Sequence, residues 1–188
     1  KIGNIPTNGR SEVINSQAKN LTAFLDSYHR LTHLPEPEYK TVSIQALFTK
    51  LERLLQAEPR SERVVYCDGK VDRSTGKELQ VYGDANLLTL ALINLIRNAL
   101  QAVEGQEDGI VRVDTCAGAT GHLLIIITDN GPGIPPERLS AIFTPFFSTK
   151  SGGSGIGLPI SQRIMQLHGG QLSVSSIPNV RTEFRMEF

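Results

Sequence analysis

The chain has 188 residues, of which 39% are apolar and 20% are charged, a composition typical of a soluble globular domain. Lysine plus arginine equals aspartate plus glutamate, 19 of each, so the formal net charge is zero, which argues against a nucleic-acid binder and against a protein that binds anionic membranes. The two cysteines, Cys67 and Cys116, do not form a CxxC pair, which argues against a zinc ribbon or a disulfide scaffold and favours a cytoplasmic setting.

Residues 10–34 are predicted to form one helix, because apolar residues recur along it at alternating steps of four and three, as in a heptad seam. Pro35 and Pro37 end this helix. A helix so apolar packs either on its own domain or in a helical bundle whose other helices are missing or come from a second subunit. The chain does not begin with methionine, and we expect it to be a fragment of a longer protein.

Beyond the prolines, the pattern alternates between helices and strands. Asp84 stands at an N-cap position, and Gly169 and Gly170 follow the last predicted helix. The stretch 129–155 is rich in glycine, proline, serine and phenylalanine, and because glycine clusters flank it, we expect a hinged lid. The apolar spacing predicts helices over 42–57, 85–103 and 156–167, and strands over 64–67, 79–82, 109–116, 122–128, 172–176 and 182–188, with a hairpin loop at 118–121.

Amide side chains follow one face of the predicted helix 85–103. Asn94, Asn98 and Gln101 are spaced by four and three residues, so they lie about one turn apart on the same face. A polar outer face would explain this spacing, but Leu92, Leu95 and other apolar residues occupy most of the circumference, which is more typical of a cavity lining. Amide oxygens are hard neutral ligands that suit a Mg²⁺ ion already carrying phosphates.

Asp129 comes directly after the apolar strand 122–128 and before Gly131 and Gly133. Its carboxylate can accept a hydrogen bond from an exocyclic amine such as that of adenine, while the glycines let the backbone approach a flat ligand. All four residue types in Asp-Asn-Gly-Pro are also turn formers, so this motif taken alone indicates a plain turn.

Two further motifs lie near the end of the long loop. Phe143, Phe146 and Phe147 would be costly in water, and we expect them to pack as the anchor of the lid. The glycines of 153–157 precede a helix, where free N–H groups and the positive end of the helix dipole form a phosphate site. A lone GxGxG is weak evidence, and its position after the other motifs makes it informative.

In this order the motifs resemble those of the catalytic ATP-binding domain of two-component sensor histidine kinases, in the GHKL superfamily with gyrase and MutL. The resemblance spans about residues 40–188 and is most similar to the nitrogen-regulation type. It implies a two-layer α/β sandwich of the Bergerat type, with five or six strands, three main helices on one face and an N-terminal bundle helix.

The resemblance also implies a division into two domains. Residues 1–36 would be the C-terminal part of a truncated dimerisation and phosphoacceptor bundle, and residues 37–188 the catalytic ATP-binding domain. The N box matches 94–99 (NLIRNA), the G1 box 129–134 (DNGPGI), the F box 143–147 (FTPFF) and the G2 box 153–158 (GSGIGL).

The resemblance implies ATP and Mg²⁺ as cofactors and a role for each motif residue. Asn98 would bind Mg²⁺, Asn94 would support the phosphates, and Lys150 would neutralise phosphate charge, which makes these three the implied catalytic residues. Many relatives carry lysine where this chain has Gln101, and glycine where it has Arg181. The implied nucleotide-binding residues are Asn94, Asn98, Gln101, Asp129, Gly131, Gly133, Ile134, Lys150, Gly153, Ser154, Gly155, Ile156, Gly157, Leu158 and Thr182, with Asp129 on the adenine amine and Thr182 near the adenine.

The residue at position 94 indicates which reaction to expect. ATPases of this superfamily carry a water-activating glutamate there, whereas this chain has Asn94, which favours kinase over ATPase. An imidazole acceptor needs no such base.

The four histidines do not match the phosphoacceptor of the family. His29 is followed by Arg30 and His33 by Leu34, so both lack the acidic residue that follows the acceptor in the family. We interpret them, together with His122 and His168, as structural.

The implied partners are a phosphoacceptor bundle of the same or a sister subunit and a response regulator receiver domain, in a parent that is a homodimer. No nucleic acid is expected, and a membrane would be reached only through missing parts of the parent. Two alternatives remain. A serine/threonine kinase of the anti-sigma type shares the fold but lacks the bundle helix and usually keeps the glutamate, and a non-catalytic nucleotide-sensing module would transfer no phosphate.

Overall fold

The computed structural model describes residues 22, 29, 32–67, 78–117, 122–150 and 153–188. The chain divides into two compact units, Lys1–Pro35 and Glu36–Phe188. In the first unit, Thr22, His29 and Thr32 are helical, and the N–H of His33 donates to the carbonyl of His29 at 2.9 Å. The rest of the helix predicted over 10–34, the predicted hairpin loop 118–121 and residues 151–152 of the lid lie outside the described residues.

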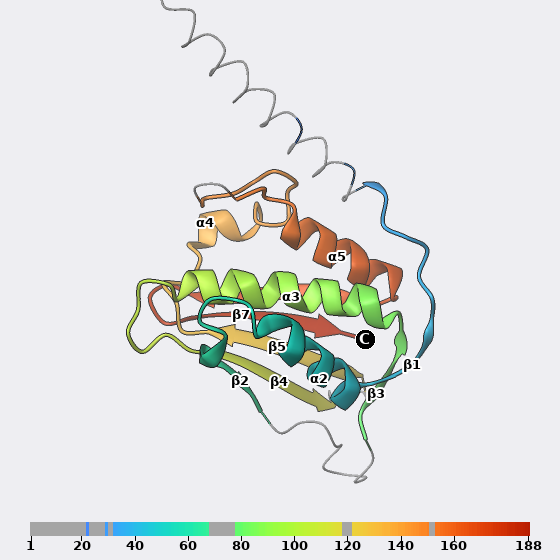
Figure 1. The fold of residues 1–188 in the computed structure, drawn as a ribbon. Coiled ribbons are helices and arrows are strands. Elements are labelled where there is room, and N and C mark those ends of the chain that lie inside the picture. Colours follow the sequence, from blue (N-terminus) through green and yellow to red (C-terminus); the bar gives the residue numbers. More distant parts are fainter. Residues whose placement is uncertain (1–21, 23–28, 30–31, 68–77, 118–121, 151–152) are drawn as a thin grey trace, which may run out of the picture. The chain divides into compact units, whose positions relative to one another are not determined.

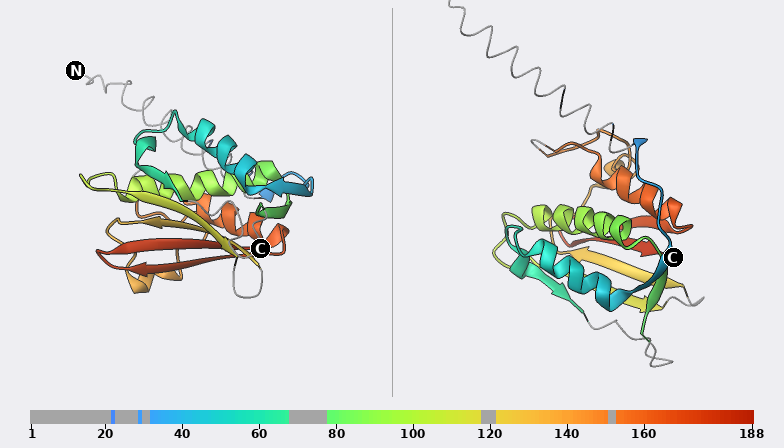
Figure 2. Two further views of the ribbon diagram at one scale, coloured as in Figure 1. Left: turned by 90° about the horizontal axis from the view of Figure 1, so that it is seen from below. Right: turned by 45° about the vertical axis from the view of Figure 1, so that its right-hand side comes forward.

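The second unit is a two-layer α/β sandwich, as predicted, in which three helices cover one face of a mixed sheet (Figures 1 and 2). Strand β2 runs parallel to β4, and the other neighbours in the sheet are antiparallel. The helices are α2 (Ile44–Leu55), α3 (Ala85–Ala102) and α5 (Gly157–Leu167), and the sheet order is β2 (Val64–Tyr66), β4 (Val111–Ala117), β5 (Leu123–Asp129), β7 (Arg181–Glu187) and β6 (Gln171–Ile177).

A separate two-stranded ribbon pairs β1 (Lys40–Ser43) with β3 (Gln80–Gly83). The sequence-based prediction started a helix at Val42, which was wrong, because Val42 instead pairs with Val81 across this ribbon. Helix α2 begins only after Ser43, whose hydroxyl accepts a hydrogen bond from the N–H of Ala46 at 3.1 Å. The long loop is also less irregular than predicted, since it contains the short helix α4 (Pro136–Leu139), with proline at its first position. A 3₁₀ turn, η1 (Ser61–Arg63), precedes β2.

Helix α3 lies at the centre of the core. Its Leu92, Leu95 and Ile96 are fully buried, as are Ile125 and Ile127, which point toward the helices from alternate positions of β5. Burial of these side chains fixes which face of α3 is turned to the core, and it leaves the amide face free to line a cavity.

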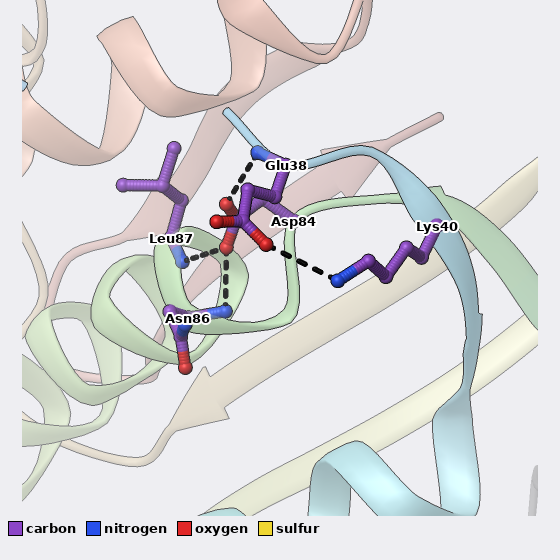
Figure 3. A network of polar contacts seen from close by, with 5 residues as sticks. All are labelled: Glu38, Lys40, Asp84, Asn86 and Leu87. Atoms are coloured by element: carbon purple, nitrogen blue, oxygen red, sulfur yellow. Dashed lines mark hydrogen bonds and ion pairs between the residues drawn. The ribbon is translucent and has the colours of Figure 1, made fainter. Parts of the chain in front are cut away.

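The N-terminus of α3 is capped by Asp84, as predicted (Figure 3). One carboxylate oxygen accepts from the N–H groups of Asn86 and Leu87 at 2.7 and 3.0 Å, and the other accepts from the N–H of Glu38 at 2.8 Å. The N–H of Asp84 itself donates to Nε2 of His168 at 2.9 Å. Burial alone would raise the pKa of Asp84, but these backbone donors hold it below its ordinary value.

Replacing Asp84 with alanine should lower the free energy of unfolding by about 2 kcal/mol at pH 7, because an N-cap and a second buried acceptor are lost together. The pKa of Asp84 in the folded chain lies below its ordinary value of 3.8. The contribution of the Asp84 carboxylate to stability is therefore fully present above pH 3.8, and it is lost as the pH falls through the pKa of the folded state. Urea unfolding at pH 7 and at about pH 2.5 measures this. The difference between wild type and variant should shrink at the acidic pH. Asp84→Asn, which keeps an acceptor oxygen, is the control with a smaller loss, and an unchanged difference at both pH values would contradict a charge-based cap.

Candidate functional site

A cavity of about 580 Å³ lies between α3, the lid and the N-terminus of α5, with the ends of β5 and β7 in its wall. This volume is in the range of small-molecule sites. It is lined by Asn94, Arg97, Asn98, Gln101, Ala102, Asp129, Pro132, Gly133, Ile134, Pro135, Arg138, Ile142, Phe147, Ser148, Thr149, Lys150, Gly153, Ser154, Gly155, Gly157, Leu158, Thr182 and Phe184.

The amide face of α3 forms one wall, which confirms the predicted lining and excludes the alternative of a polar outer face. Asn94 and Asn98 are half-buried, whereas Gln101 is exposed in the last turn. The side chain of Asn94 donates to the carbonyl of Gly157 at 3.4 Å, so α3 and the start of α5 meet at the wall of the cavity.

Lys150 extends from the lid toward this wall. Its ammonium donates to Oε1 of Gln101 at 2.8 Å, and Oδ1 and the carbonyl oxygen of Asn98 lie at 3.5 and 3.4 Å. Burial lowers the pKa of Lys150, while the carboxylates of Asp129 and Glu104 oppose that shift. A positive charge is therefore held in the cavity beside the amide oxygens.

Asp129 is the last residue of β5, rather than the first residue after the strand as predicted, and its side chain is only 2% exposed. Its Oδ1 accepts from the N–H of Gly131 at 2.9 Å. Burial raises the pKa of Asp129 to about 6, although the Gly131 N–H and the charge of Lys150 pull it down. A side chain at position 131 would come within 2.7 Å of Oδ1, so Gly131 shapes the site without lining the cavity.

Thr182 lies directly beside Asp129, because β5 and β7 pair these two residues. Thr182 is 3% exposed, and its hydroxyl is 3.2 Å from Oγ of Ser176. Ser176 in turn accepts from the N–H of Ile134 at 2.8 Å, which ties the glycine-rich turn after β5 to the β6–β7 pair. Sequence reasoning missed Ser176, since a lone serine in a strand carries no motif.

The phenylalanines of the lid are less buried than predicted. Phe146 is 39% exposed, and Phe143 and Phe147 are only half-buried, so the three rings are not a buried anchor. The buried apolar residue of this segment is Ile142, at 8% exposure. Within the lid the main chain makes its own contact: Phe146 has a left-handed φ of 65°, and its N–H donates to the carbonyl of Gly155 at 3.0 Å.

All predicted nucleotide-binding residues line the cavity except Gly131 and Ile156, which is buried at the start of α5. Sequence reasoning missed two arginines, Arg97 and Arg138. Arg97 precedes Asn98 in the N box and pairs with Glu58 through its Nε at 2.9 Å. No spacing pattern distinguishes Arg138, which lies in α4, from a surface residue.

Within the described parts of the chain, no group of three or more histidine, cysteine or acidic residues could hold a metal ion. The helices described there include none long and apolar enough to cross a membrane. His122 bonds to the carbonyl of Phe188 and His168 to that of Ile164, both at 2.7 Å, as expected for structural histidines.

Comparison with known proteins finds one family and several sensor histidine kinases that resemble this chain. Residues 83–188 match the family described as histidine kinase-, DNA gyrase B- and HSP90-like ATPase. The chain is 33% identical over 178 residues to the sensor histidine kinase ZraS of Salmonella typhimurium, covering 92% of this chain and 37% of that protein. It is 34% identical over 182 residues to the sensory histidine kinase/phosphatase NtrB of Vibrio alginolyticus, covering 92% and 50%. The chain thus spans half or less of the length of these relatives.

Solved structures of histidine kinases have a similar fold. The catalytic domain of histidine kinase ThkA superposes with a TM-score of 0.66 at 28% identity, covering 80% of this chain and 95% of that chain. ThkA in complex with the response regulator protein TrrA aligns with all of this chain and 53% of its own, with a TM-score of 0.69 at 22% identity, which supports the fold alone.

Proposed function

Because the chain belongs to the histidine kinase-, DNA gyrase B- and HSP90-like ATPase family, as the catalytic ATP-binding domain of a two-component sensor histidine kinase, we propose that it transfers the ATP γ-phosphoryl group to a histidine on a helical bundle. The residues of the cavity wall are the observation that favours phosphoryl transfer over ATP hydrolysis. Asn94 stands where a water-activating glutamate would be needed, and Asp129 is the only carboxylate among the described residues that line the cavity. A neutral imidazole brings its own lone pair and needs no base.

We place the adenine against Asp129 and Thr182. Asp129 is buried and ends a strand, so its carboxylate can accept from the adenine amine away from water. Thr182 lines the cavity beside it. The phosphates would then lie between Lys150 and Gly157, where no side chain of the described residues caps the N-terminus of α5 and its first N–H groups can face an anion.

The amide oxygen of Asn98 suits a magnesium ion that arrives with the nucleotide. It already lies 3.5 Å from the ammonium of Lys150, so it faces a position that a cation occupies. One neutral amide would not hold Mg²⁺ by itself, which agrees with an ion bound mainly by phosphates. Asn98 would hold the ion, and the ion would neutralise phosphate charge.

In this proposal, residues 1–36 are the C-terminal part of a truncated dimerisation and phosphoacceptor bundle, and residues 37–188 are the catalytic domain. The division of the chain after Pro35 supports this arrangement. The acceptor histidine would lie in the missing part of the bundle, in the same or a sister subunit of a homodimer. The phosphoryl group would pass from there to the receiver domain of a response regulator, in the cytoplasm.

The test is phosphotransfer to a separate partner. With γ-labelled Mg-ATP, the chain alone should remain unlabelled, whereas a separately produced bundle bearing the parent's acceptor histidine should gain label that is labile in acid and stable in base. Transfer should be weak, because the linker no longer provides a millimolar effective concentration. Asn98→Ala should reduce the labelling at least tenfold if it loses one charge-assisted contact of about 1.5 kcal/mol.

Three outcomes would contradict the proposal. Acid-stable label on serine or threonine would favour an anti-sigma type of kinase. Rapid phosphate release by the chain alone would mean that another group activates water. Absence of label on every bundle, with ATP still bound, would favour a nucleotide-sensing module.

A further inference from the structure

Gln101 and Lys150 come from different sides of the cavity and meet at its edge. Gln101 lies in the last turn of α3, and Lys150 lies 49 residues later in the lid. Their hydrogen bond of 2.8 Å joins Oε1 of the amide to the ammonium. Both residues line the cavity that we assign to the nucleotide.

This bond is the strongest of those that Lys150 makes to α3. The two contacts with Asn98, at 3.4 and 3.5 Å, are at the long limit for a hydrogen bond, whereas 2.8 Å is the length of a charge-assisted one. The lysine side chain is otherwise four flexible methylenes, which cannot fix the position of its charge. Gln101 therefore makes the closest contact of α3 with the ammonium.

Arg97, the cation of α3 that lines the cavity, has a partner of its own. Arg97 is held by Glu58, which is not a cavity residue. Lys150, in contrast, is bonded to neutral oxygens, so its charge remains uncompensated by a direct ion pair among the described residues and is available to an anion. Asp129 acts on it electrostatically but lies beyond ion-pair distance in the described structure.

We propose that Gln101 is a positioning residue, which holds the ammonium of Lys150 beside Asn98 so that a cation from the lid meets the nucleotide phosphates at the α3 wall. The inference rests on the proposed placement of the phosphates. In this arrangement, α3 supplies the acceptor and the lid supplies the charge. Gln101 acts through Lys150 and makes no essential contact with the nucleotide of its own.

A double-mutant cycle on nucleotide binding tests this. The variants are Gln101→Met, which keeps the length of the side chain without its oxygen, Lys150→Met, and both together. Binding of a non-hydrolysable Mg-ATP analogue and of adenosine is measured by calorimetry. Gln45→Met, in an exposed glutamine of α2 outside the cavity, is the matched control and should bind both ligands like wild type.

For the ATP analogue, Lys150→Met should weaken binding about tenfold or more, and Gln101→Met about three- to tenfold. The double variant should match Lys150→Met within about twofold, since Gln101 has nothing left to position. Adenosine carries no phosphate, so its affinity should not change in any variant.

Two results would overturn the inference. Multiplicative losses in the double variant would mean that Gln101 contacts the nucleotide independently. An equal loss of adenosine affinity in Gln101→Met would mean that the substitution merely distorts the cavity. The proposed function has its own test: it fails if wild type binds the analogue but transfers no label to any bundle. In that case the double-mutant cycle on nucleotide binding still decides the role of Gln101.

Discussion

Replacing Asp129 with asparagine is expected to stabilise the unliganded fold while weakening nucleotide binding by one to two orders of magnitude. The pKa of Asp129 rises from 3.8 to about 6 because the carboxylate is buried. Between these two pH values the folded chain binds more protons than the unfolded chain, so this residue's contribution to stability falls as the pH rises through that window. Above about pH 6 the folded protein bears the full penalty of a buried charge, on the order of 3 kcal/mol.

Asparagine removes this charge and keeps an oxygen for the N–H of Gly131. At pH 8 the variant should therefore unfold about 6 to 12 °C above wild type, as expected for about 3 kcal/mol in a domain of this size. The gain should shrink at pH 5, where wild-type Asp129 is mostly protonated. Thermal unfolding without ligand measures both, and a variant that melts below wild type at pH 8 would contradict the cost of burial.

The same substitution should weaken ATP binding about ten- to a hundredfold, because a charge-assisted hydrogen bond to the adenine amine, worth about 1.5–3 kcal/mol, is lost. Wild type should itself bind ATP more weakly as the pH falls below about 6, since the ionised carboxylate accepts a charge-assisted bond from the amine and the protonated group accepts only a weaker neutral one. Calorimetry of both proteins at pH 5 and pH 8 checks this. Wild-type affinity in the variant would remove Asp129 from the adenine site.

Elements defined by local patterns were predictable. The N-cap at Asp84 follows from residue type and position, and the wall formed by Asn94, Asn98 and Gln101 follows from helical spacing beside buried leucines. Asp129 was found because glycines follow an apolar strand, although its own burial showed only in the structure. In each case, the information lies within about one or two helical turns of the residue.

Features that depend on distant partners were not predictable. Strand β1 exists because Lys40–Ser43 pairs with a segment about 40 residues later, and four residues carry too little periodicity to show it. Ser176 joins the site through the pairing of β6 with β7 and through its bond with the N–H of Ile134, 42 residues earlier in the chain. The phenylalanines of 143–147 were predicted to be buried from their hydrophobicity, whereas Phe146 is exposed and Phe143 and Phe147 are half-buried in the folded chain.

Gly155 should be the glycine of the G2 box that the fold cannot replace. Its φ is +65°, and an added Cβ would lie 2.5 Å from the carbonyl carbon of Phe146 and 2.7 Å from the carbonyl oxygen of Phe147. Both are backbone atoms, which cannot move aside as a flexible side chain would. Gly155→Ala must therefore adopt a left-handed conformation, at about 1–2 kcal/mol, and also displace the lid backbone.

Gly157 offers the matched control, because a Cβ there would meet nothing closer than Cγ of Asn94 at 3.7 Å, and alanine favours the helix that begins at this residue. We expect Gly155→Ala to lower the free energy of unfolding by about 2–4 kcal/mol and to weaken ATP binding at least tenfold, since the lid carries Lys150. Gly157→Ala should unfold within about 0.5 kcal/mol of wild type and lose affinity only through its methyl group at the phosphates. Urea unfolding and calorimetry on the two variants separate these effects. If Gly155→Ala were as stable as wild type, neither the left-handed φ of Gly155 nor its close approach to the backbone of Phe146 and Phe147 would constrain the fold. If both variants were equally destabilised, the two glycines would share one structural role.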